Sequence, residues 1–134
     1  MYFKRSCSSH SQTDLDSKGD AWDNRRWRAL LKLLRWECPC PLPVQVRRAK
    51  LSEEIYGDTE YIEQEKPLFR IRISSHLDYS LAKATLIHEW AHALAHHPAA
   101  WTTERRVVED HGAVWGVEYA RVYRVVEREE ERNA

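Results

Sequence analysis

The spacing of apolar residues predicts a helix in the first third of the chain, from Asp20 or Asp23 to about Trp36. Within this stretch, large apolar residues recur every three or four positions, as they do on the buried face of an amphipathic helix. The prolines in the run 38–43 cannot continue a helix, so we expect it to end there. The apolar residues of this face are Trp27, Leu30, Leu31 and Leu34, with Trp22 just before them.

A strand pattern follows between residues 44 and 74. Its clearest part is Leu68–Ser74, in which apolar and polar residues alternate as they do in a strand with one buried face. An extended run also begins at Val44, and residues 60–64 have the composition of a short strand. Between these two we expect a turn at residues 56–58, because glycine and aspartate are common turn residues.

Two helices are expected in the second half of the chain. The first begins near Asp78 or Ser80, either of which can cap a helix, and runs to about residue 97, where a proline follows. The second is expected to begin at Thr102 or Thr103. Its apolar residues recur at helical spacing and place His111 on the buried face of that helix.

The chain of 134 residues is long enough for one domain. Residues 1–19 are polar and nearly without large apolar side chains, so we expect a flexible N-terminal tail. Residues 20–130 are expected to form the folded domain, and residues 131–134 a frayed end. The pattern predicts an α+β protein with an N-terminal helix, a small mainly antiparallel sheet and two C-terminal helices.

The apolar helix near residue 90 carries the motif H-E-x-x-H, made by His88, Glu89 and His92. Residues four apart lie on one face of a helix, so both imidazoles can reach one metal ion. Imidazole suits zinc, which in catalytic sites usually takes a third protein ligand and keeps one position open. Glu89 lies next to the first histidine, where it can act as general base.

A second block, H-G-A-V-W, begins at His111 and ends at Trp115. With H-E-W-A-H it resembles the SprT-like (Spartan-like) zinc metallopeptidases, over about residues 68–124. The resemblance implies a minimal zincin-like fold and a zinc endopeptidase that hydrolyses protein or peptide substrates. It implies that His88, His92 and His111 bind Zn²⁺ and that Glu89 is the catalytic base. It does not choose between Tyr119 and Tyr123 as a group that stabilises the oxyanion.

Two other interpretations stay open. The first block is also similar to ImmA/IrrE-type peptidases, whose third zinc ligand is acidic. Alternatively, the chain is a zinc-stabilised module that binds DNA or another partner with little turnover. The acidic candidates for a third ligand are Glu104, Glu109 and Glu118.

In zinc peptidases of this general build, the strand before the metal helix lies along the cleft and pairs with an extended substrate. Leu68–Ser74 is therefore the expected substrate edge.

The net charge is zero, but residues 1–50 carry 11 Lys and Arg against 5 Asp and Glu. This excess predicts a basic surface on the N-terminal helix that could bind DNA. An odd cysteine count and the absence of an apolar signal or membrane segment favour a cytoplasmic protein, which we expect to be a monomer. The basic residues of the predicted helix are Arg25, Arg26, Arg28, Lys32 and Arg35.

Overall fold

The computed structural model describes residues 2–8, 20–96 and 111–134, with side chains described from residue 20 onward. The described residues form both helices and strands, which confirms the predicted α+β class. The elements are β1 (Tyr2–Ser8), α1 (Asn24–Glu37), β2 (Val44–Ala49), β3 (Ile55–Ile62), β4 (Leu68–Ser74), α2 (Tyr79–His96) and α3 (Ala113–Arg132).

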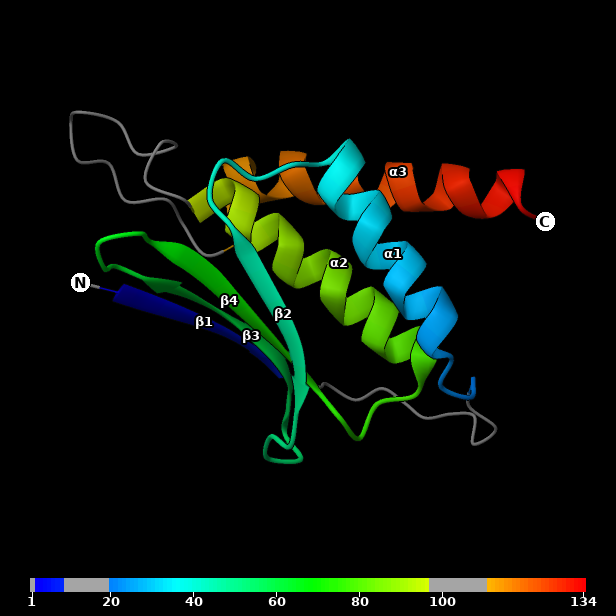
Figure 1. Ribbon diagram of the computed structural model, residues 1–134, viewed down its shortest axis with the longest axis horizontal. Coiled ribbons are helices and arrows are strands. Elements are labelled where there is room, and N and C mark those ends of the chain that lie inside the picture. Colours follow the sequence, from blue (N-terminus) through cyan, green and yellow to red (C-terminus); the bar gives the residue numbers. More distant parts are fainter. Residues whose placement is uncertain (1, 9–19, 97–110) are drawn as a thin grey trace.

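The strands form one mixed sheet in the order β1-β3-β4-β2. β3 is antiparallel to both β1 and β4, whereas β2 runs parallel to β4. Figure 1 shows the helices together on one side of this sheet. α2 packs on β3 and β4, and α3 packs on α2. The sheet and α3 therefore enclose α2, the helix that carries the H-E-x-x-H motif.

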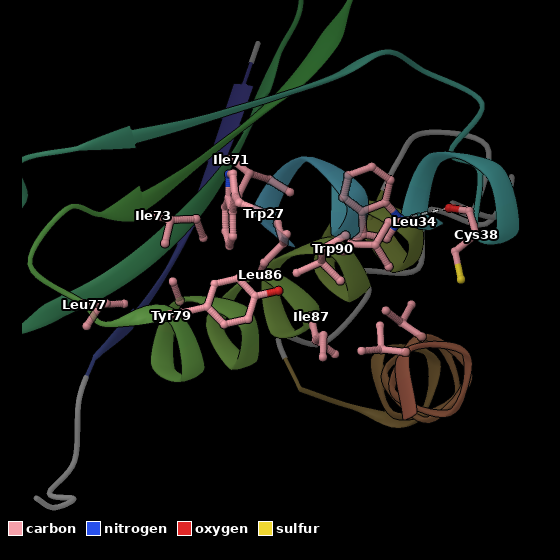
Figure 2. Packing of buried hydrophobic residues seen from close by; sticks show 14 of the residues in the cluster. Trp27, Leu34, Cys38, Ile71, Ile73, Leu77, Tyr79, Leu86, Ile87 and Trp90 are labelled. Carbon is pink, nitrogen blue, oxygen red and sulfur yellow. Dashed lines mark hydrogen bonds between the residues drawn. The ribbon is translucent and has the colours of Figure 1, made fainter. Parts of the chain in front are cut away.

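The hydrophobic core fills the space between the sheet and the helices (Figure 2). Trp90 is almost fully buried there, and its Nε1 donates a hydrogen bond of 2.8 Å to the carbonyl oxygen of Cys38. This bond ties α2 to the end of α1. The other large side chains that are buried completely include Leu34, Phe69, Ile71, Ile73 and Leu86.

The predicted starts of two helices are confirmed. Asp23 caps α1, because its carboxylate accepts hydrogen bonds from the backbone N–H groups of Arg25 and Arg26. Asp78 does the same for α2, where its Oδ1 accepts a hydrogen bond of 2.9 Å from the Leu81 N–H. Within the residues described, no helix is long and apolar enough to cross a membrane.

Residues 2–8 differ from the expected flexible tail, because they form β1 and pair with β3 from Tyr2 opposite Ile62 to Ser8 opposite Ile55. Strand addition at a sheet edge is made by backbone hydrogen bonds, which need no alternating apolar pattern. The sequence pattern therefore gave no signal for this strand. The rest of the expected tail, residues 9–19, lies outside the described residues.

The prediction of a turn at residues 56–58 is wrong, because all three residues lie within β3. Gly57 has another reason to be glycine. A Cβ atom there would lie 2.8 Å from the carbonyl oxygen of Arg72 and 2.8 Å from the side chain of Thr85 in α2. The missing side chain allows α2 to lie close against the sheet.

The expected substrate edge is also wrong. β4 lies inside the sheet, with β3 on one side and β2 on the other. Its backbone N–H and C=O groups already pair with these two neighbours, so an added peptide strand cannot pair with it. The alternating pattern identified the strand correctly, but it carries no information on which strands lie beside it.

We expect Gly57→Ala to lower the free energy of unfolding by about 1–3 kcal/mol, the usual cost of overpacking a close contact. The matched control is Gly116→Ala in α3, where a Cβ atom meets nothing within 4 Å. That change should be neutral or stabilise the protein by up to ~1 kcal/mol, because alanine is the better helix former. Urea unfolding of both variants measures the difference, and equal stabilities would contradict the role given to Gly57.

Candidate metal centre

Three histidines converge where α2 meets the start of α3. His88 and His92 lie one turn apart on α2, and His111 lies two residues before α3 begins. Each offers one ring nitrogen, and the three nitrogens all lie within 4.8 Å of one another. Nε2 of His88 lies 3.0 Å from Nε2 of His111. The structure thus brings all three predicted ligands together, close enough to hold a metal ion.

The donor set fits zinc. Two nitrogens bound to one tetrahedral zinc are about 3.3 Å apart, given Zn–N bonds of about 2.0–2.1 Å. The separation of 3.0 Å between the ring nitrogens of His88 and His111 is near this value. The other nitrogens are at most 4.8 Å apart, so only small shifts of the side chains are required. Of the three residues, His92 is buried, His88 is partly buried and His111 is exposed. Solvent can therefore approach the three histidines from the side of His111.

The placement of His111 differs from the expectation. It was predicted on the buried face of the last helix, but α3 begins at Ala113, with Gly112 as its N-cap in an extended conformation. His111 therefore belongs to the turn before α3 and reaches the other two histidines from the N-terminal end of that helix. The expected helix start at Thr102 or Thr103 lies outside the described residues.

Trp115 closes one side of the histidine cluster. The centre of its ring lies 4.9 Å from that of His88, 5.7 Å from that of His92 and 4.8 Å from that of His111. Tyr119 stacks on Trp115 and lies 6.3 Å from His88. The exposed Tyr123 lies one turn further along, beside Tyr119. Of the two tyrosines that the sequence offered, Tyr119 is therefore the one next to the histidines.

Glu89 is completely buried between α2 and the sheet. Its Oε1 accepts a hydrogen bond of 2.6 Å from the hydroxyl of Thr59, which lies in the middle of β3 and is also fully buried. Sequence reasoning gave Thr59 no role. Because the pattern predicted a turn at residues 56–58, it did not predict one continuous strand there. The face of the sheet on which Thr59 lies could therefore not be predicted.

The acidic alternatives for the third ligand do not join the cluster within the described part of the chain. Glu118 forms an ion pair of 2.9 Å with Arg121 on the same helix. It does not belong to the group formed by the three histidines. Glu104 and Glu109 lie outside the described residues.

Cys38 and Cys40 do not belong to the cluster either. Burial raises the pKa of both thiols above the usual value, which keeps them protonated at neutral pH. Both side chains pack against the hydrophobic core as small apolar groups.

Comparisons of the chain with protein-family models, with characterised proteins and with solved structures found no match. The resemblance to SprT-like peptidases therefore rests on the two sequence motifs alone.

We expect His111→Ala to weaken metal binding at least as much as His92→Ala, because each removes one of three nitrogens. The loss should exceed the 10- to 100-fold that is typical when only a residue behind a ligand is changed. Glu118→Gln is the matched control and should keep most of the affinity. Competition with a chelator measures the dissociation constants. Normal binding by His111→Ala together with a loss in Glu118→Gln would favour the ImmA/IrrE-like interpretation.

Proposed function

We propose that this protein is a zinc metalloendopeptidase of the SprT-like kind, with a minimal zincin-like fold. The observation that supports this most is the convergence of three histidine nitrogens within 4.8 Å, with a buried carboxylate next in sequence to the first of them. His88, His92 and His111 are the residues that would hold the metal. The position of α2 between the sheet and α3 is compatible with the fold proposed.

Held by these three histidines, a zinc ion would supply Lewis acidity, which would polarise a peptide carbonyl and lower the pKa of bound water to about 7. The role of Glu89 is to accept a proton from the water that attacks the scissile carbonyl. It then delivers this proton to the nitrogen of the leaving amine, so that its carboxylate is regenerated.

We expect the aromatic residues next to the histidines to lie beside the bound substrate. The indole Nε1 of Trp115 donates a hydrogen bond of 3.4 Å to the carbonyl oxygen of His88. This contact fixes the ring against the first turn of the motif. Because Trp115 and Tyr119 stack, they form one apolar wall beside the partly exposed His88. We expect this wall to exclude water from one side of the reacting bond.

The proposal predicts that Glu89→Gln lowers the rate of peptide hydrolysis by at least about 100-fold, since general acid–base catalysis typically contributes 10²–10⁴-fold. The variant should still bind about one zinc per chain, because Glu89 is not one of the three ligands. Elemental analysis of the purified protein measures zinc, and digestion of a proteome-derived peptide library measures hydrolysis. A zinc-loaded wild-type protein that cleaves no peptide, or a fully active Glu89→Gln variant, would contradict the proposal.

A second function, binding of nucleic acid, is favoured by a separate surface on α1. Trp36 is 81% exposed there. It lines a surface hollow together with Arg28, Lys32 and Arg35. An exposed aromatic ring can stack on a base while the cations contact phosphates, as in proteins that bind single strands. Arg26 is less suited to this role, because it lies over the ring of Tyr79 and pairs with Asp20.

If this surface binds single-stranded DNA, affinity should fall steeply as salt rises, with a log–log slope of about −0.7 for each phosphate contacted. Replacing Arg28 and Lys32 with Gln should weaken binding and reduce the slope by about 1–2. Exchange of Arg124 and Arg128 for Gln, on α3, is the control and should change neither value. Fluorescence anisotropy with a labelled oligonucleotide measures both, and absence of binding at low salt would leave α1 as a solvated face.

A further inference from the structure

We infer that Thr59 is a positioning residue that orients the carboxylate of Glu89 for proton transfer. The inference rests on the proposed function, because it assigns a partner to the proposed general base. It concerns a residue on a different element from the motif, since Thr59 lies in β3 and Glu89 in α2.

The hydrogen bond has the length of a charge-assisted one. The Oγ1 of Thr59 lies 2.6 Å from Oε1 of Glu89, whereas a hydroxyl that donates to an ionised carboxylate is usually about 2.5–2.7 Å away. The same Oγ1 lies 3.1 Å from the backbone carbonyl oxygen of Glu89. A hydroxyl has one proton, so it can donate to only one of these two oxygens, and the shorter contact is the one to the carboxylate oxygen.

The position of this hydroxyl is fixed by the packing of the sheet. Thr59 lies opposite the fully buried Ile71 of β4. Two residues earlier, Gly57 allows α2 to approach the same face of β3. Successive odd-numbered residues of β3 point to one face, so the approach at Gly57 also brings Thr59 to α2. The hydroxyl is thus held in place before a substrate arrives.

The alternative is that the bond serves only to fasten β3 to α2. The two roles differ in what the loss of the hydroxyl changes. A fastening role affects stability and metal content together. A positioning role affects the turnover number, because a carboxylate free to rotate spends less time aligned with the water and the amine.

The test compares Thr59→Val, which keeps the shape but removes the hydroxyl, with Thr59→Ser, which keeps the hydroxyl. The full-length, zinc-loaded protein is used with one peptide that the wild type cleaves. We expect Thr59→Val to lower kcat by roughly 10- to 100-fold, with KM and zinc content unchanged within about twofold. Thr59→Ser should restore kcat to within about threefold of the wild type.

The matched control is Thr85→Val. Thr85 is also buried, and its hydroxyl donates a hydrogen bond of 2.8 Å to the carbonyl oxygen of Leu81 within α2. It lies one turn before His88 but does not contact Glu89 through its hydroxyl. Loss of this second buried hydroxyl should leave kcat within about twofold of the wild type.

Three results would overturn the inference while leaving the proposed function standing. They are an unchanged kcat in Thr59→Val, a Thr59→Ser variant as slow as Thr59→Val, and a loss of zinc that accounts for the whole loss of activity. If Thr59→Val does not fold, Thr59→Ala, which also lacks the hydroxyl, is measured in its place by the same criteria. A zinc-loaded wild-type protein without hydrolytic activity would overturn the inference and the proposed function together.

Discussion

The packing of α2 against the sheet is the contact on which the rest of the structure depends. Most of the helix is buried, because the sheet covers one side of it and α3 the other. A helix in that position must be apolar over most of its surface, and most of the buried residues of α2 are apolar. Burial of such groups costs free energy unless they are hydrogen-bonded or bind a metal. The fully buried Glu89 and His92 therefore require specific partners at fixed positions.

The partners come from both sides of α2. From the sheet, Thr59 donates to Glu89. From the other side, α3 brings Trp115 against His88 and places His111 at the edge of the cluster. The proposed base and the proposed ligands thus face different neighbours, although they are adjacent on one helix. A change in the distance between α2 and β3 would act on Glu89, whereas a change at the start of α3 would act on the histidines.

Signals within a few residues of one another predicted the helices and strands well. Features that depend on contacts between distant parts of the chain were not predicted. The caps Asp23 and Asp78 and the alternation of Leu68–Ser74 are read within a few residues, so they could be placed. The order of strands, the pairing of β1 and the reason for Gly57 depend on segments far apart in the chain. The convergence of His111 with the motif was predicted from the resemblance, but its place in the turn before α3 was not.

The buried carboxylate is also the feature that best separates the proposed peptidase from the zinc-stabilised binding module that the sequence left open. Both interpretations use the same three histidines, so metal binding alone would not distinguish them. A structural zinc site closes its fourth position with another ligand and has no use for a base. Burying Glu89 beside such a site would cost free energy and would contribute nothing to its function. The structure instead contains a carboxylate held by Thr59 on the element next to the helix, together with a third histidine open to solvent. That combination favours hydrolysis over a purely structural metal site, whatever the basic face of α1 binds.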